Sequence, residues 1–146
     1  MKALIQRVRH AAVDVAGERV GEIGVGLLVF LGVERDDSEV KCVRLAERVL
    51  AYRVFADDAG KLNRSVCDID GEVLVVSQFT LAADTAAGNR PSFTPAAPAG
   101  LGRLLYERFV AEIAGRRGQV ATGRFGADMQ VSLVNDGPVT FLLTIT

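Results

Sequence analysis

The uninterrupted apolar run at residues 25–33, VGLLVFLGV, constrains the fold of this chain more than any other segment. A continuous run of this kind is typical of a strand that is buried in a sheet. Residues 72–79 contain a second apolar run, EVLVVSQF, which also predicts a strand. Glycines at positions 21, 24, 26 and 32 indicate bends or bulges around the first run. We therefore expect a sheet with buried strands at the centre of the fold.

The remaining segments predict further strands and two helices. Strands are expected at residues 2–9, 11–16, 20–23, 118–121, 128–135 and 138–145, with a turn at 16–19. The first helix begins after an N-cap at Ser38 and runs to about Tyr52. The second runs from about Pro98 to Ala114 and stops at Gly115. The expected apolar faces are Val40, Val43, Ala46, Val49 and Leu50 on the first helix, and Leu101, Leu105, Phe109 and Ile113 on the second.

This order of elements predicts an α+β fold rather than an alternating α/β fold. We expect a single domain over residues 1–146, with a mostly antiparallel, barrel-like sheet and two main helices. The loop at residues 82–97 is long and without periodicity, which is typical of a functional loop or of disorder.

Charge and cysteine content narrow the class of protein. The formal net charge of −1 argues against general coating of nucleic acid, but it permits a small contact with one RNA end. A local basic group could make such a contact or could be solvated surface: Arg103, Arg108, Arg116, Arg117 and Arg124. No apolar run approaches the roughly 20 residues of a membrane helix, and the N-terminus lacks a signal-peptide pattern, so we expect no membrane partner. Cys42 and Cys67 fit no metal or redox spacing, which favours a reduced, cytoplasmic chain.

Conventional catalytic machinery is missing from the sequence. The one histidine, His10, is not coupled by any pattern to Ser77, Thr80 or Cys67, so a nucleophile with a matched base is not indicated. No cluster has metal-ligand spacing and no phosphate loop is present, so we expect neither a metal nor another cofactor. The acidic turn at residues 34–37 is interpreted as a solvated loop. Hydrolysis of an activated ester could instead use backbone N–H donors at residues 78–80, with Thr80 as nucleophile as an open alternative.

Two short motifs carry the functional signal, SQFTL at residues 77–81 and NDGPVT at residues 135–140. Each lies at the end of a strand-like run, where a rigid scaffold can present backbone and small polar groups. The Gly137-Pro138 step offers a neighbour only carbonyl oxygens and a fixed shape. Each motif alone would be structural: a strand end with Phe79 in the core, and a tight turn.

Together the two motifs resemble those of the D-aminoacyl-tRNA deacylase family that carries a Gly-cis-Pro motif. The resemblance covers nearly the whole chain, through ALIQRV at 3–8, VGEIG at 20–24, VVSQFTL at 75–81, NRPSF at 89–93, TGRFGADM at 122–129 and NDGPVT at 135–140.

The resemblance implies a carboxylic ester hydrolase that releases a D-amino acid from the 3′-terminal adenosine of tRNA, as chiral proofreading by steric rejection of L-amino acids. It also implies action on glycine mischarged on tRNA(Ala), and a homodimer without a metal whose active site lies at the subunit interface. Gln78, Phe79 and Thr80 would form the catalytic floor near the ester, with help from the substrate's 2′-hydroxyl.

The substrate-binding residues implied by the resemblance are Ser77, Met129, Gly137, Pro138 and Arg7. Gly137-Pro138 of one subunit would enter the other subunit's pocket, with Arg7 holding its orientation. A non-catalytic module that binds an RNA end or a protein remains the alternative.

Overall fold

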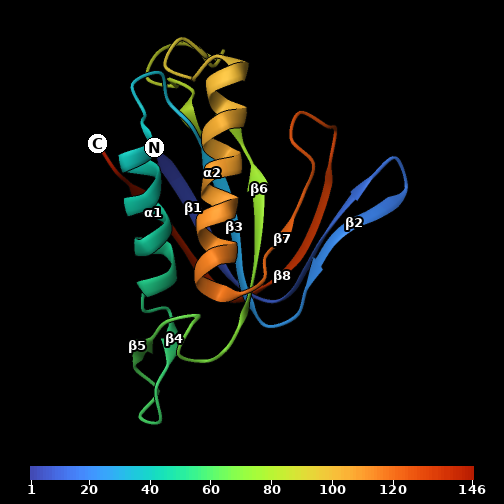
Figure 1. Cartoon of the computed structure of the whole chain (residues 1–146), viewed down its shortest axis with the longest axis vertical. Coiled ribbons are helices and arrows are strands. Elements are labelled where there is room, and N and C mark those ends of the chain that lie inside the picture. The colour runs from blue at the N-terminus through green and yellow to red at the C-terminus, as the bar shows by residue number, and fades with distance from the viewer.

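The computed structural model describes residues 1–146, which fold around one six-stranded sheet (Figure 1). The strands are β1 (Lys2–Val15), β2 (Glu18–Ile23), β3 (Gly26–Gly32), β6 (Glu72–Ser77), β7 (Ala121–Thr122) and β8 (Gln130–Thr144). Their order is β2-β1-β3-β6-β7, and β8 pairs with the other edge of β1. β1 is antiparallel to β2, β3 and β8, whereas β3, β6 and β7 are parallel. Because β2 also contacts β6 and β7, the sheet curls into a nearly closed barrel. The predicted α+β class and barrel-like sheet are confirmed.

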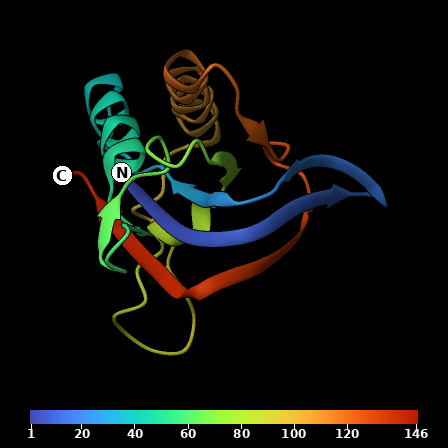
Figure 2. The ribbon, with the colours of Figure 1, turned by 90° about the horizontal axis from the view of Figure 1, so that it is seen from below.

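Both helices pack on the same face of the sheet and against each other (Figure 2). α1 (Glu39–Ala51) and α2 (Ala99–Arg117) cover the main core, in which Ile5, Leu45 and Phe109 are fully buried or nearly so. A smaller core, which includes Val8 and Leu74, fills the curl of the sheet. β4 (Phe55–Ala56) and β5 (Leu62–Arg64) form a separate hairpin, and a 3₁₀ turn, η1, spans Phe79–Ala82. No helix is long and apolar enough to cross a membrane.

The helix predictions are right in position and wrong in two details. The Ser38 cap is confirmed, since its hydroxyl accepts a hydrogen bond from the Lys41 N–H at 3.4 Å. Val40 is 69% exposed, because α1 buries the side that carries Cys42 and Leu45. α2 runs through Gly115 to Arg117 and is capped by Gly118, whose φ of 81° is the left-handed conformation that glycine adopts without a steric penalty.

Several strand boundaries also differ from the prediction. Residues 2–9 and 11–16 form one strand, β1, and β6 ends at Ser77 rather than residue 79. β7 is only two residues long. The expected strands at 128–135 and 138–145 are a single strand, β8, because Val8 pairs with Asn135 and Gln6 pairs with Thr140. Four residues of β8, 136–139, therefore lie opposite Arg7 alone, so the Gly-Pro step is a bulge within a strand and not a turn between two strands.

A candidate active site beside the ends of β3 and β6

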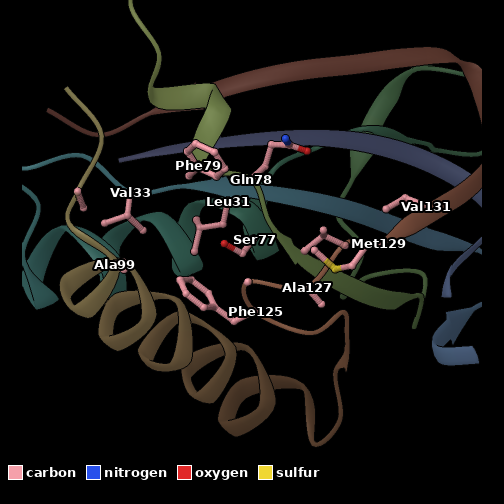
Figure 3. A pocket seen from close by; sticks show the side chains of 14 residues that line it. Leu31, Val33, Ser77, Gln78, Phe79, Ala99, Phe125, Ala127, Met129 and Val131 are labelled. Carbon is pink, nitrogen blue, oxygen red and sulfur yellow. The ribbon is translucent and has the colours of Figure 1, made fainter. Parts of the chain in front are cut away.

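A cavity of about 480 Å³ opens where β3 and β6 end, under the first turn of α2 (Figure 3). In this view the side chains of Leu31 and Ser77 lie between those of Phe79 and Phe125. Fourteen residues line the cavity, ten of them hydrophobic: Leu31, Val33, Val76, Ser77, Gln78, Phe79, Ala97, Ala99, Gly102, Phe125, Gly126, Ala127, Met129 and Val131. Its size is suited to a small ligand or to the end of a larger one.

The structure brings four of the eight expected site residues to this cavity and leaves four outside it. Ser77, Gln78, Phe79 and Met129 line the wall. Thr80 follows directly in η1 but does not line the cavity. Arg7, Gly137 and Pro138 are also absent from the wall, because they lie where β1 pairs with β8, and β3 separates β1 from β6.

None of the lining residues has an ionisable side chain. The cavity therefore contains no acid, base or charged nucleophile of its own. Polar chemistry at its wall comes from backbone groups, the Ser77 hydroxyl and the Gln78 amide.

The backbone at the end of β6 turns sharply into η1. The Gln78 N–H donates to the Leu31 carbonyl at 2.8 Å, which keeps Gln78 attached to the end of β3. η1 then begins at Phe79 without a side-chain cap, so the N–H groups of Phe79 and Thr80 have no partner within the turn. The Gln78 amide instead donates to the Thr80 hydroxyl at 2.5 Å. The turn thus leaves backbone donors beside the cavity wall.

Phe79 does not enter the core, as the structural interpretation of its motif would require. Its side chain is 58% exposed and packs against Phe93, with ring centroids 5.2 Å apart. Sequence reasoning did not assign Phe93 to the site. The only available signal was its place in the NRPSF segment of the long loop.

The opposite wall is built by Phe125, which sequence reasoning also did not single out. Its ring packs against Tyr106 at 5.6 Å, and the Arg103 guanidinium lies over it at 4.9 Å. The Tyr106 hydroxyl donates to the Val75 carbonyl at 3.2 Å. Burial raises the pKa of Tyr106 to about 12, with a smaller contribution from Glu107, so this phenol stays protonated and supports the wall.

The Gly137-Pro138 peptide bond is cis, and both residues are exposed. Arg7 holds the preceding residue, because its Nε donates to the Asp136 carbonyl at 2.8 Å while its Nη1 donates to the Val54 carbonyl at 2.7 Å. The Asn135 side chain closes the bulge: its amide donates to the Arg7 and Val139 carbonyls, and its oxygen accepts from the Val139 N–H. The motif is therefore a rigid, outward-facing feature.

A side chain at position 137 would not fit this bulge. A Cβ built there would lie 2.4 Å from the Val139 nitrogen, well inside van der Waals contact. Glycine is thus required by the local packing as well as by any contact with a ligand.

The other charged groups named from the sequence are mostly engaged elsewhere. Asp37 is buried and binds the Met1 ammonium at 2.7 Å, while Glu34 binds the same ammonium at 3.0 Å, so the acidic turn is not simply solvated. Burial acts to raise the pKa of Glu34, but the Met1 ammonium and Lys2 outweigh it and lower that pKa. His10 is exposed and lies in a different hollow, with Arg19.

The basic group divides into paired and unpaired arginines. Arg108 and Arg116 form ion pairs with Glu112, and Arg117 pairs with Asp70. These contacts favour the solvated-surface interpretation for Arg108 and Arg116, whereas the Arg117 side chain is only 13% exposed and also donates to the Gly71 carbonyl at 2.7 Å. Arg103 pairs with Glu107 at 3.6 Å and also covers Phe125. Arg124 is the one member of the group that makes no ion pair.

The family model and the relatives that match this chain all carry the description of a deacylase that acts on aminoacyl-tRNA. Residues 4–144 match the family described as D-Tyr-tRNA(Tyr) deacylase. The chain is 60% identical over 143 residues to the D-aminoacyl-tRNA deacylase of Stutzerimonas stutzeri, with 98% of this chain and 99% of that protein covered. It is 58% identical over 145 residues to the D-aminoacyl-tRNA deacylase of Haemophilus influenzae, covering 99% and 100%.

Two solved structures are similar over the whole length. The structure called c-Myc DNA Unwinding Element Binding Protein superposes with a TM-score of 0.95 at 40% identity, covering 100% of this chain and 99% of that one. A probable eukaryotic D-amino acid tRNA deacylase superposes with a TM-score of 0.88 at 16% identity, covering 99% and 98%. At that identity the second likeness concerns the fold alone.

Proposed function

The chain belongs to the D-Tyr-tRNA(Tyr) deacylase family, and on this premise we propose that it hydrolyses the ester bond of D-aminoacyl-tRNA, releasing the tRNA and the free D-amino acid. The observation that carries this proposal is the cavity at Ser77–Phe79, which has backbone donors beside it and no ionisable side chain in its wall. An ester of an amino acid is activated enough for positioning and oxyanion stabilisation to drive its hydrolysis. The whole chain acts as one domain in this reaction.

Backbone donors supply the main chemical step in this mechanism. The ester carbonyl lies against the Phe79 and Thr80 N–H groups, which stabilise the oxyanion as water attacks. One donor of this type contributes on the order of 10²–10³ in rate. The 2′-hydroxyl of the terminal adenosine assists the attack, since the cavity wall offers no general base.

Thr80 has a supporting role rather than that of the nucleophile. Its hydroxyl already accepts a hydrogen bond from Gln78, and no base is positioned to take its proton. The Gln78-Thr80 contact instead keeps the first turn of η1 in shape.

Stereospecificity comes from Gly137-Pro138 of a second copy of the chain. Its carbonyls accept hydrogen bonds from the substrate ammonium, and with the ester fixed this sets two directions at the α-carbon. A D side chain then points outward, whereas an L side chain meets the Gly-Pro wall. The support is that the motif is rigid, exposed and outside its own cavity. Glycine has no Cβ to reject, so glycine mischarged on tRNA(Ala) is also a substrate.

A two-fold homodimer would bring the motif to the partner's cavity. β8 pairs only with β1, so its other edge is open. Three apolar residues of β8 are exposed: Val134 at 42%, Phe141 at 39% and Leu142 at 53%. Apolar side chains beside an open strand edge are typical of an interaction surface.

The dimer is tested by sedimentation at assay concentrations. Leu142→Asp should shift the protein toward monomer and lower deacylation with it, because a carboxylate would be desolvated in the contact. Val40→Asp, at a 69% exposed site on α1, is the matched control and should change neither. A fully active wild-type monomer would contradict the cross-subunit role of Gly137-Pro138.

We also propose a cytoplasmic location, where the substrate is made and where the unpaired Cys42 and Cys67 stay reduced. The deciding experiment for the function is deacylation of D-tyrosyl-tRNA by the purified protein. Release of D-tyrosine with multiple turnovers supports it, whereas protection of the ester would make the chain a non-catalytic module that binds the RNA end.

A further inference from the structure

An exposed aromatic surface begins at the cavity and continues outside it. Phe79 lines the cavity, whereas Phe93 does not, although their rings are 5.2 Å apart and tilted by 53°. The two side chains are 58% and 42% exposed. The pair therefore forms a continuous apolar path from the cavity wall to the outer surface.

The loop that carries Phe93 is fixed in place. Asp84 and Ser92 exchange two backbone hydrogen bonds, at 2.8 and 2.9 Å, which close the base of its tip. On the other side of Phe93, the Ala96 N–H donates to the Phe93 carbonyl, and Arg35 bonds to the Thr94 and Pro95 carbonyls. Figure 2 shows this loop, in olive, projecting on the side of the sheet away from the helices. Because the backbone on both sides of Phe93 is hydrogen-bonded and its ring packs against Phe79, the exposed ring is held in a defined position where a ligand can contact it.

The same loop carries an unused positive charge. Arg90 lies three residues before Phe93, is exposed, and makes no ion pair or side-chain hydrogen bond. The nearest acid in the loop sequence, Asp84, already accepts a hydrogen bond from the Ala86 N–H. Arg90 is therefore free to meet an anionic group that approaches the aromatic pair.

We propose that Phe79 and Phe93 form a stacking platform for the base of the nucleotide that precedes the terminal adenosine of tRNA, with Arg90 contacting the phosphate backbone. The inference rests on the proposed function, because it takes the ester-bearing terminal nucleoside to lie in the adjoining cavity. That cavity, at about 480 Å³, has the size of a site for one small ligand, so in this proposal the aminoacylated nucleoside fills it and the preceding nucleotide lies outside.

The chemistry of a single-stranded RNA end fits such a platform. Unpaired bases splay out and stack on aromatic side chains, and this stacking tolerates any base because each has a π-face. Phe93, the part of the platform that lies outside the cavity, would hold the RNA without touching the ester. It would therefore increase affinity for tRNA and leave the chemical step unchanged.

The test compares a large and a minimal substrate, D-tyrosyl-tRNA and the D-tyrosyl ester of adenosine. Phe93→Ala should raise KM for the tRNA about tenfold or more, which is about 1.4 kcal/mol, and leave kcat unchanged. The same variant should cleave the adenosine ester like the wild type. Phe93→Tyr keeps the ring and should restore tRNA binding, and it serves as the readout if Phe93→Ala folds poorly. Leu104→Ala, 54% exposed on α2, is the control for loss of surface apolar area.

Arg90→Ala should weaken tRNA cleavage and reduce the slope of log affinity against log salt concentration by about 0.7, the value for one single-strand phosphate contact. Arg44→Ala is its matched control, since Arg44 is also exposed and unpaired but lies on α1.

Three results would overturn the platform. Equal losses on both substrates would mean that Phe93 acts through the cavity. A shift of Phe93→Ala toward monomer in sedimentation would assign the aromatic pair to a second copy of the chain. A wild-type protein that cleaves neither ester would remove the proposed function itself, and its premise with it.

Discussion

Replacing Arg7 tests whether its hydrogen bonds stabilise the fold. Arg9 is a neighbouring control that carries the same charge without those hydrogen bonds. Both guanidinium groups approach the Asp136 carboxylate, at 3.7 and 3.6 Å. The Arg7 side chain is only 16% exposed and also donates to the Asp136 and Val54 carbonyls, whereas Arg9 is 71% exposed and makes only the ion pair. The two variants Arg7→Ala and Arg9→Ala therefore remove the same charge with different contacts.

The expected loss in free energy of unfolding is several-fold larger for Arg7→Ala than for Arg9→Ala. A hydrogen bond from a charged donor contributes about 1.5–3 kcal/mol, so the loss of two costs about 3 kcal/mol at the lower end of that range. An exposed ion pair contributes about 0–1 kcal/mol, which is the expected cost of Arg9→Ala. Arg7→Lys keeps the charge but cannot reach both carbonyls with the fork geometry of a guanidinium, so it should resemble Arg7→Ala.

Two measurements check this reasoning. Denaturant unfolding at one fixed protein concentration should give a lower midpoint for Arg7→Ala than for Arg9→Ala, with the same slope. Deacylation of D- and L-tyrosyl-tRNA should show at least a tenfold smaller D/L ratio for Arg7→Ala only, since the Gly-Pro wall has lost its anchor. Stabilities of the two variants within about 0.5 kcal/mol would refute the hydrogen-bond argument. A large loss of stability with an unchanged D/L ratio would limit Arg7 to the fold.

Three further predictions follow from the site and its surroundings. Thr80→Ala and treatment with a strong chelator should each reduce deacylation less than about tenfold, or roughly 1.4 kcal/mol, in steady-state kinetics, and a loss of 10⁴ on Thr80→Ala with an intact fold would establish Thr80 as nucleophile. At equal enzyme concentration, D-alanyl- and glycyl-tRNA should be cleaved and L-alanyl-tRNA almost not at all, whereas equal cleavage of the D and L forms would exclude a steric wall. The pKa of Glu34 is lower in the folded state than its ordinary value of 4.5, so the charged carboxylate stabilises the fold at pH values above 4.5. This stabilisation is lost as the pH falls through the lowered pKa. Wild type and Glu34→Gln should therefore differ in free energy of unfolding at neutral pH and converge in acid, and a constant difference at all pH values would contradict the ion pair.

Local signals in the sequence were enough to predict the elements of the fold. The Ser38 cap and the apolar run at residues 25–33 each favour a secondary structure through residues that are close in sequence. The sequence therefore predicted α1 and β3 close to where they lie. The D-aminoacyl-tRNA deacylase resemblance was also readable from the sequence, because its motifs are short runs that keep their residues and order.

The tertiary structure decided features that depend on distant partners. Gly115 and Gly118 are equivalent as helix stops in sequence, and α2 ends at the one that reaches the left-handed conformation. The break expected at Gly137-Pro138 became a bulge, because β1 pairs with β8 on both sides of it. By residue type alone, Phe79 could have been a core residue. In the structure it lies just after the end of β6 and packs against Phe93, so it is exposed at the surface.

The site itself combines both kinds of information. The sequence predicts chemistry that depends on the backbone at residues 77–80, since it shows no base matched to a nucleophile and no metal-ligand spacing. The resemblance already placed Met129 in the site, whereas only the structure brought Phe125 to the same cavity and left Gly137 outside it, because strand order and register, rather than nearness in sequence, set which residues share a wall.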